Sequence, residues 1–293
     1  MNFFRARRPV TAVLLAVLGL AATGCHHAAT TASVTPTSSP SPAAATDTWV
    51  KTGTSHVNSV TGAEGLASRP DGSLLHRGLG SIPLRVRKQG WKHLGDPDIA
   101  DGDIFDAYQG AASRNAKMFA VTTAGGKRLE FIHKLDPGEL FNNSFDTVSP
   151  DGQWLVAGEF GAQQRLLVFP APLLNHSTPP GGGALPQAGP ITLSKTVRNI
   201  QGCDFVLATE LMCSTNDGDK DVVRVVLPHP LDGRALVGQV TTVFQIPRIS
   251  HCPGKFEAEG LDFSPATQVL RVEIVLPGVC KAVTDVIAYH RTA

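Results

Sequence analysis

The stretch SRPDGSLL at residues 68–75 recurs as SPDGQWL at residues 149–155, and in a degraded form as FSPATQVL at residues 263–270. Pro-Asp-Gly forms a tight turn, because Pro presets φ, Asp accepts hydrogen bonds from the chain that follows, and Gly adopts positive φ. An apolar run follows each turn, as at residues 154–157, and favours a strand that packs between sheets. We therefore expect a turn and its buried strand to repeat along the chain.

The spacing of these copies gives the length of the repeat. Pro70 and Pro150 are 80 residues apart, and Pro150 and Pro265 are 115 residues apart. These distances correspond to about two and three units of roughly 40 residues, the usual length of a four-stranded propeller blade. Helical periodicity is nearly absent, and short β-rich runs alternate with Gly, Pro, Asp and Asn clusters, which is typical of all-β folds.

The sequence thus predicts a single β-propeller over residues 47–293, which are 247 residues and about six blades, with five or seven left open. A β-sandwich is the alternative, because it needs no 40-residue period. We expect Trp49-Val50 to pair with the C-terminal blade, which would close the ring and remove exposed sheet edges. The Ser-Pro-Asp-Gly turns resemble those of extracytoplasmic six- and seven-bladed propellers, a resemblance of architecture that transfers no activity.

The N-terminal residues predict export from a bacterial cytoplasm. Arginines at positions 5, 7 and 8 precede an uncharged apolar run at residues 10–20, and small residues lead to Cys25; this is the pattern of a signal peptide over residues 1–24. The run is too short to span a bilayer, which takes roughly 20 residues. Small residues followed by cysteine resemble the bacterial lipobox, although Ala22 stands where leucine is most common. That resemblance implies a lipid on Cys25 that holds the protein at the membrane; an ordinary signal peptide cut elsewhere is the alternative.

Residues 25–46 are expected to form a disordered tether, because from residue 28 onward every residue except Val34 is Ala, Thr, Ser or Pro. Whether export uses the general or the twin-arginine pathway stays open.

The three arginines of the signal peptide account for the positive net charge of the sequence, since without them there are 23 basic and 25 acidic residues. Such a neutral domain offers no electrostatic basis for nucleic-acid binding.

Four cysteines remain in the expected domain, and an even number in an exported protein predicts disulfides. Cys203–Cys213 and Cys252–Cys280 are the favoured pairs among three possible pairings. The first pair flanks two short apolar runs around the turn at residues 208–210, so a hairpin would bring the two cysteines opposite each other. No Cys-x-x-Cys spacing occurs, which argues against a cysteine metal site.

A repeated tetrapeptide is the strongest candidate for chemistry. Ala-Glu-Gly-Leu occurs with its glutamate at Glu64 and again at Glu259. In a propeller the first strand of each blade lines the central channel, so both glutamates can converge there. Glu-Gly-Leu is similar to segments of calcium-dependent propeller hydrolases, the lactonase-like and phytase-like families, in which a channel carboxylate binds a hard cation. The other interpretation is that each glutamate hydrogen-bonds the neighbouring blade.

Two further segments are weaker candidates. The acidic loop at residues 96–103 contains Asp96 and Asp98, with Asp106 just beyond; closely spaced carboxylates around a glycine can bind Ca²⁺, although the spacing departs from an EF-hand and a solvated inter-blade loop is the alternative. Polar residues and two phenylalanines alternate at residues 139–146, which suits either a ligand-contacting loop or a turn with two core residues.

Three functions are compatible with these features. The usual catalytic motifs are absent from the sequence, which favours a surface-anchored binding or scaffold module for a cell-envelope protein or a small-molecule ligand. A metal-dependent extracytoplasmic hydrolase of a lactone or phosphoester is the second, with Glu64 and Glu259 in the channel. The solute-capturing lipoprotein of a transporter fits poorly, because such proteins are usually two-lobed α/β structures. Whether the protein is an enzyme stays open.

Overall fold

A computed structural model describes residues 48–292 of the chain. The predicted signal peptide (1–24), the lipid on Cys25 and the tether (25–46) lie outside the described residues. Within residues 48–292, no helix has both the length and the apolar character needed to cross a membrane.

The described residues form twenty strands and very little helix. The strands are β1 (Thr48–Asn58), β2 (Gly65–Ser68), β3 (Leu74–Arg77), β4 (Trp91–Leu94), β5 (Asp98–Ala100), β6 (Asp103–Gly110), β7 (Ala116–Thr122), β8 (Arg128–Lys134), β9 (Asp146–Val148), β10 (Trp154–Ala157), β11 (Ala162–Pro170), β12 (Gly183–Ala184), β13 (Ile191–Arg198), β14 (Ile200–Leu207), β15 (Glu210–Thr215), β16 (Asp221–Val226), β17 (Leu236–Gln245), β18 (Glu257–Ser264), β19 (Val269–Val275) and β20 (Val283–Thr292). The helical parts are α1 (Leu84–Lys88) and three 3-10 turns (Leu79–Ser81, Ala112–Arg114 and Gly278–Ala282).

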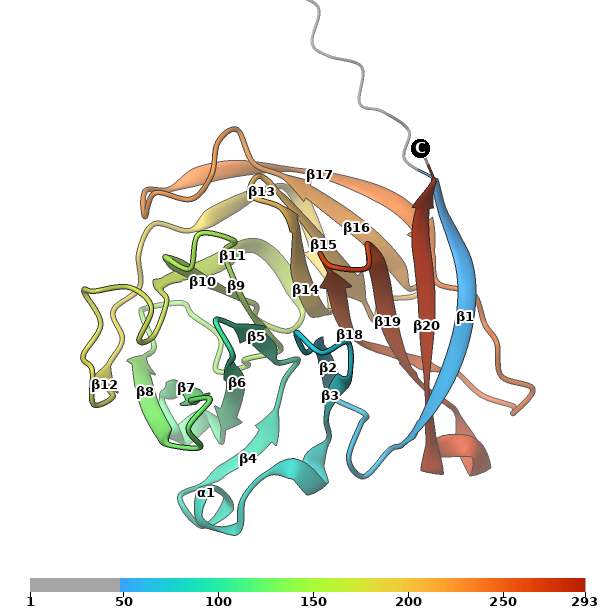
Figure 1. Cartoon of the computed structure of the whole chain (residues 1–293), viewed down its shortest axis with the longest axis horizontal. Coiled ribbons are helices and arrows are strands. Elements are labelled where there is room, and N and C mark those ends of the chain that lie inside the picture. The colour runs from blue at the N-terminus through green and yellow to red at the C-terminus, as the bar shows by residue number, and fades with distance from the viewer. Residues whose placement is uncertain (1–47, 293) are drawn as a thin grey trace, which may run out of the picture. The chain divides into compact units, whose positions relative to one another are not determined.

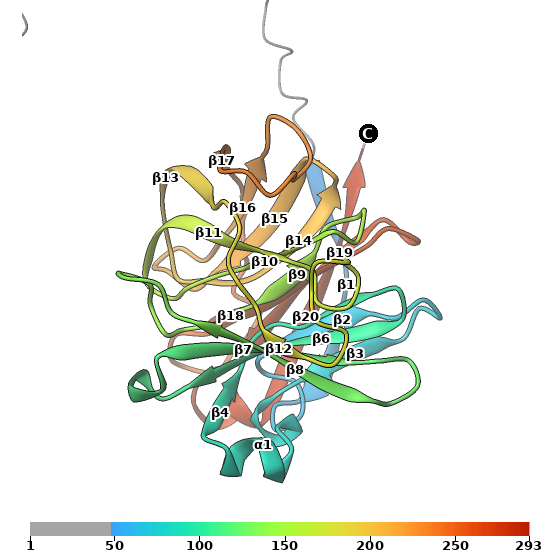
Figure 2. The ribbon, with the colours of Figure 1, turned by 90° about the vertical axis from the view of Figure 1, so that its left-hand side faces the viewer.

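The strands form consecutive antiparallel groups around a common centre (Figures 1 and 2). Four groups contain four antiparallel strands in sequence: β5-β6-β7-β8, β9-β10-β11-β13, β14-β15-β16-β17 and β18-β19-β20-β1. In the first of them β4 also pairs with β6, beside β5, and β12 pairs with β8; a parallel pairing of β13 with β17 joins the second and third groups into one eight-stranded sheet. The fifth is the hairpin of β2 and β3. The innermost strands contact one another in the order β2, β5, β9, β14, β18 and back to β2. A closed ring of sheets is the arrangement of a β-propeller.

The all-β prediction is therefore confirmed, and the described strands do not form the two stacked sheets of a sandwich. The count of about six blades is not confirmed, since the described strands make five groups. The difference arises because some groups are longer than the 40-residue average: β9-β10-β11-β13 runs from residue 146 to residue 198, which is 53 residues.

Ring closure follows the sequence prediction. β1 pairs antiparallel with β20 over its whole length, with Trp49 opposite Arg291 and Val50 opposite His290. Trp49 is buried, and its ring meets Phe263 of β18 edge to face at 6.3 Å between centroids. The N-terminal strand thereby covers the edge that β20 would otherwise expose.

The Pro-Asp-Gly turns have the predicted geometry. The Asp71 carboxylate accepts the Ser73 amide at 2.9 Å, and Gly72 has φ +84°. In the second copy, Asp151 accepts the Gln153 amide at 3.0 Å, and Gly152 has φ +70°. Both turns join an innermost strand to the next strand of its group, as the repeat predicts.

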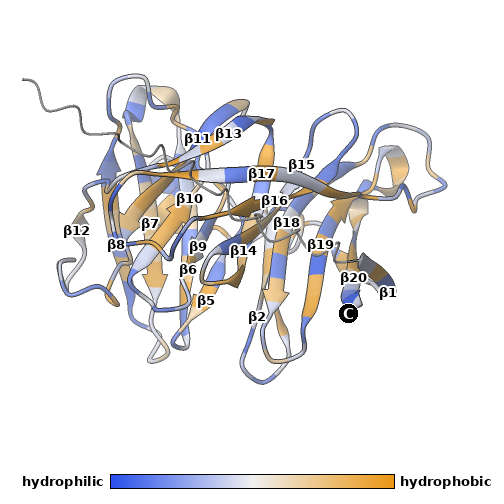
Figure 3. Cartoon of the chain, turned by 90° about the horizontal axis from the view of Figure 1, so that it is seen from above, coloured by the Kyte–Doolittle hydropathy of each residue, from blue (hydrophilic) through white to orange (hydrophobic). Residues whose placement is uncertain are grey.

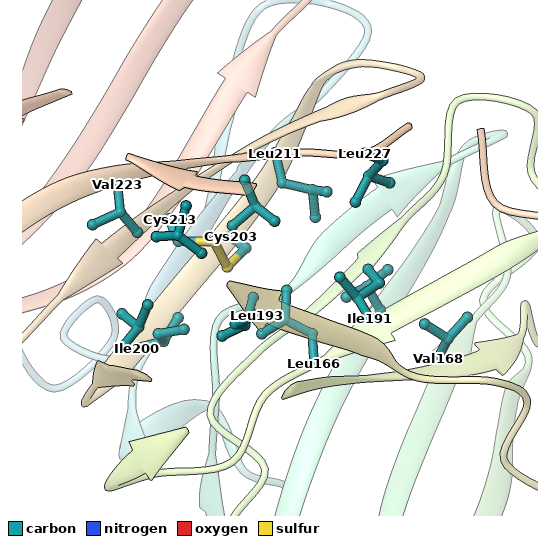
Figure 4. Packing of buried hydrophobic residues seen from close by; sticks show 14 of the residues in the cluster. Leu166, Val168, Ile191, Leu193, Ile200, Cys203, Leu211, Cys213, Val223 and Leu227 are labelled. Atoms are coloured by element: carbon teal, nitrogen blue, oxygen red, sulfur yellow. A yellow bond between two sulfur atoms is a disulfide. The ribbon is translucent and has the colours of Figure 1, made fainter. Parts of the chain in front are cut away.

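Apolar side chains fill the spaces between neighbouring groups. Figure 3 shows that the hydrophobic residues concentrate in the strands. Figure 4 shows the cluster between β9–β13 and β14–β17, where Leu166, Val168 and Ile191 face Leu211 and Leu227 across the gap. The disulfide Cys203–Cys213 lies inside this cluster.

Both favoured disulfide pairs are present. Cys203 and Cys213 are direct cross-strand partners of β14 and β15, and Cys252 is bonded to Cys280. Two disulfides in one domain indicate an oxidising compartment outside the cytoplasm.

Candidate functional site

The innermost strands all run in the same direction along the ring axis, so their N-terminal ends meet at one mouth. A cavity of about 690 Å³ opens there; we call it the mouth cavity. Its lining includes Glu64, His93, Glu257 and Glu259, together with polar side chains from four further segments: Gln109, Asn142, Ser144, Gln201 and Asn216. The structure thus brings together the two glutamates of the repeated tetrapeptide, which are 195 positions apart (259 − 64).

Glu64 forms an ion pair with His93 of β4. The Oε2 atom of Glu64 lies 3.1 Å from Nε2 of His93, whose side chain is half exposed. The hydrogen bond to Glu64 raises the pKa of His93, because the carboxylate favours the charged imidazolium; burial opposes the shift. His93 lies in no motif, and only the pairing of β4 with β6 brings it to the mouth. Sequence reasoning therefore missed it.

Glu259 lies in an irregular segment of β18. The pairing with β19 shifts register between Ala258 and Leu261, and the Ser214 hydroxyl donates to the Glu259 carbonyl. The Glu259 side chain is buried, and burial raises its pKa well above the usual range. The neighbouring Glu64 and Glu257 raise it further, because like charges oppose ionisation.

Asp96 explains why the tetrapeptide is repeated. Its completely buried carboxylate accepts the Leu66 amide at Oδ1 and the Leu261 amide at Oδ2, each at 2.9 Å. A side chain on Gly65 or Gly260 would begin 2.3 or 2.2 Å from an Asp96 oxygen, so only glycine fits. In each copy the leucine amide and the glycine enclose Asp96, while the glutamate faces the mouth cavity.

The structure does not bring Asp96 or Asp98 to the two glutamates. Both oxygens of Asp96 are engaged as described, and Asp98 lies at the opposite end of the ring. There it lines a second cavity of about 710 Å³ with Asp204 and Asp262. Each of these three carboxylates accepts a backbone amide of another innermost segment: Asp98 from Val148 at 2.6 Å, Asp204 from Phe263 at 2.7 Å and Asp262 from Ser68 at 2.6 Å. They join neighbouring blades.

The other acidic residues of this loop do not converge on one site. Asp101 and Gly102 form the turn of the β5–β6 hairpin, with φ +52° and +79°. Asp103 accepts the Ala124 amide at 2.9 Å, and Asp106 binds Arg77 through two hydrogen bonds of 2.6 and 3.1 Å. In the segment 139–146, by contrast, Asn142 and Ser144 line the mouth cavity, while Phe145 is buried in the core. That loop therefore contributes one phenylalanine to the core and two polar side chains to the wall of the mouth cavity.

A separate group, His133, Asp136 and Glu139, has ligand atoms within 4.8 Å of one another and could bind a metal ion. The buried ammonium of Lys117 already donates to Glu139, and His133 Nε2 lies 2.8 Å from the same carboxylate. A cation from the chain itself therefore balances this carboxylate, and the mouth cavity is the better candidate site.

Asp98 should make stability fall as the pH rises. Burial first, and the charge of Asp262 in addition, raise its pKa from 3.8 to about 6. Between these values the native state binds more protons than the unfolded chain, so the free energy of unfolding decreases with increasing pH, by up to about 3 kcal/mol in all. Denaturant unfolding of Asp98→Asn from pH 4 to pH 7 should give a flatter profile than wild type; equal slopes would contradict the assignment.

No family model and no curated protein matches this chain. Similar solved structures include a gluconolactonase from Xanthomonas campestris, with 15% identity over 76% of this chain and 64% of that chain and a TM-score of 0.37. An arabinanase from Bacillus subtilis has 12% identity over 83% of this chain and 92% of its own, with a TM-score of 0.38. The β-propeller domain of the Trilobed protease from Pyrococcus furiosus has 10% identity over 64% and 50%, with a TM-score of 0.30.

This chain therefore spans just under two thirds of the gluconolactonase and half of the protease propeller chain. All three TM-scores are below 0.5, so the activities of these three proteins are not attributed to this chain. The comparisons find structural similarity to β-propeller proteins.

Proposed function

We propose that the mouth cavity binds a hard divalent cation such as Ca²⁺ and that the protein hydrolyses a small polar ester, a lactone or phosphoester, at this cavity outside the cytoplasm. The observation that carries the proposal is the meeting of Glu64 and Glu259 in one cavity with amide side chains. Neighbouring carboxylates oppose the ionisation of a buried carboxyl group, and a bound cation stabilises its ionised form.

The available donors suit this ion. Glu64 and Glu259 offer carboxylate oxygens, and the amides of Asn142 and Gln201 in the lining of the same cavity offer carbonyl oxygens; Ca²⁺ takes oxygen ligands of both kinds. Oε2 of Glu64 is turned to His93, which leaves Oε1 for the cation. When bound, such an ion polarises the carbonyl or phosphoryl oxygen of a substrate.

His93 and Glu64 form the pair that would move a proton. Nε2 of His93 lies 3.1 Å from Oε2 of Glu64 and the half-exposed side chain lines the cavity, whereas Nδ1 is buried and has no hydrogen-bond partner in the structure. A histidine beside a carboxylate can act in general acid–base catalysis. We assign Nε2 of His93 the transfer of a proton to the leaving oxygen.

Removing either glutamate should abolish cation-dependent stabilisation. In wild type, Ca²⁺ at a hundredfold excess over its Kd should add about 2.7 kcal/mol to the free energy of unfolding. Glu64→Gln and Glu259→Gln should lose this gain, whereas Asp98→Asn, a carboxylate at the opposite mouth, should keep it. The measurement is thermal unfolding in Ca²⁺ and in chelator, with bound metal counted in parallel. Because burial and the neighbouring carboxylates raise the pKa of Glu259, a cation competes there with a proton, and affinity should also rise with pH.

Turnover is tested separately, on chromogenic lactones and phosphoesters with and without Ca²⁺. Hydrolysis that requires Ca²⁺ and is lost in His93→Gln supports the enzyme. Calcium binding without hydrolysis of any substrate class would instead favour the second candidate, a binding or scaffold module. The observation that favours a binding module is the size of the mouth cavity: about 690 Å³ lies within the range of small-ligand pockets.

In either case we propose that the domain is held at the outer face of the cell membrane by a lipid on Cys25 and the tether of residues 25–46. Metabolic labelling with a fatty acid, compared between wild type and Cys25→Ala, tests this. Label that persists in the variant would contradict lipidation at Cys25.

A further inference from the structure

Large apolar side chains are exposed at the rim of the mouth cavity. Val60, Leu79 and Phe160 line it, and their exposed fractions are 64%, 43% and 39%. They come from separate parts of the chain: the loop after β1, the 3-10 turn Leu79–Ser81 and the turn before β11. A single exposed apolar residue carries no information, but several at one concave site mark a binding surface.

These rim residues are held in place by the backbone. The Gly80 amide donates to the Val60 carbonyl at 2.9 Å, and the Val60 amide donates to Asn58 Oδ1 at 2.9 Å. Next to Phe160, the Asn199 amide donates to the Gly161 carbonyl at 2.8 Å. The apolar rim is thus a fixed part of the cavity, which lowers the entropic cost of binding a ligand against it.

The opposite mouth of the ring has no comparable surface. None of the exposed large hydrophobic residues lines the second cavity at the opposite mouth, where Asp98, Asp204 and Asp262 lie. Within the described residues, apolar exposure and the Glu64–Glu259 pair therefore coincide at the same mouth. A polar floor beneath an apolar rim is complementary to a molecule with a polar head and a hydrocarbon chain.

We infer that the ligand of the mouth cavity is an amphiphile: an ester or lactone whose polar group contacts Glu64, Glu259 and His93 and whose saturated chain lies against Val60, Leu79 and Phe160. This inference rests on the proposed function for the identity of the polar head. The hydrocarbon chain of the ligand is inferred from the apolar rim alone, so binding and turnover can be tested separately.

The test uses γ-lactones that differ only in alkyl chain length, from γ-butyrolactone to γ-dodecalactone, with the full-length protein. Calorimetric Kd values and, where turnover is seen, kcat/KM are measured for each compound. We expect affinity to rise by about threefold to fourfold per methylene until the chain outgrows the rim. Val60→Ser and Phe160→Ser should flatten this dependence. Val237→Ser, the same substitution at an exposed position of β17 that does not line the cavity, should keep it.

The outcomes separate the two proposals. Affinity that rises with chain length without any hydrolysis would support the amphiphile inference and contradict the proposed enzyme. Hydrolysis or binding that does not depend on chain length in wild type would overturn the amphiphile inference and leave the enzyme intact. An equal dependence in wild type, Val60→Ser and Phe160→Ser would also overturn it, because the chain would then lie elsewhere.

Discussion

Replacing Glu139 by glutamine is expected to lower the free energy of unfolding by about 3–5 kcal/mol. The Lys117 side chain is completely buried and its ammonium donates to Glu139; the next carboxylate, Glu159, is 3.7 Å away. Glutamine keeps the shape of Glu139 but removes its charge, so the ammonium loses its main partner in a place that water does not reach. Equilibrium unfolding in urea measures the loss.

An exposed pair provides the matched control. Arg234 and Asp232 are 2.9 Å apart, but the arginine side chain is 86% exposed, and surface pairs contribute little to stability. Asp232→Asn should therefore cost far less than Glu139→Gln. The double variant Lys117→Met/Glu139→Gln should recover part of the loss, because no buried charge then lacks a partner. Equal costs for Glu139→Gln and Asp232→Asn would show that the buried pair contributes little.

The same pair predicts a dependence on pH. Burial opposes the ionisation of Glu139, but the hydrogen bonds from His133 and Lys117 outweigh it and lower its pKa from 4.5 to about 2. A lowered native-state pKa contributes stability that is complete above pH 4.5 and is lost as the pH falls to about 2. The difference in unfolding free energy between wild type and Glu139→Gln should shrink over this window. A difference that stays constant from pH 5 to pH 2 would contradict the assignment.

Replacing Asp96 by alanine is expected to cost about 2–6 kcal/mol, because the buried amides of Leu66 and Leu261 each lose their acceptor at about 1–3 kcal/mol. Asp96→Asn, which keeps one acceptor oxygen, should cost roughly half as much. Both variants should also weaken Ca²⁺ binding, since Asp96 holds the two segments that carry Glu64 and Glu259. Asp71→Ala, which removes an acceptor in an exposed turn, is the control and should change stability little.

Glycine substitutions test the same centre without removing a hydrogen-bonding group. A Cβ on Gly260 would lie 2.2 Å from Asp96 Oδ1 and 2.6 Å from the Gly65 backbone, whereas a Cβ on Gly53 of β1 would have nothing within 4 Å. Gly260→Ala should be strongly destabilising in the same urea experiment, and Gly53→Ala should be nearly neutral. A tolerated Gly260→Ala would mean that the centre of the ring is not closed around Asp96.

Local chemistry in the sequence determined much of this protein. Alternating apolar runs and Pro-Asp-Gly turns specify strands and their connections over a few residues, so the all-β class and the turns at residues 70–72 and 150–152 could be predicted. The Cys203–Cys213 pair followed from one hairpin, and ring closure at Trp49 followed from the need to cover an open sheet edge. The glutamates were found because their tetrapeptide is repeated.

Only the tertiary structure decided how these parts meet. His93 reaches Glu64 because β4 pairs with β6, a contact that no local pattern encodes. Asp96 and Asp98 are two residues apart, yet one hydrogen-bonds Leu66 and Leu261 at the centre of the ring and the other lines the cavity at the far mouth, because the extended chain advances along the ring axis from one residue to the other. The number of groups depended on long connections, such as the one between β11 and β13, that lengthen a group beyond the average repeat. Sequence patterns report the local conformation of each strand, whereas the site is made by side chains from separate blades whose positions the closed ring sets.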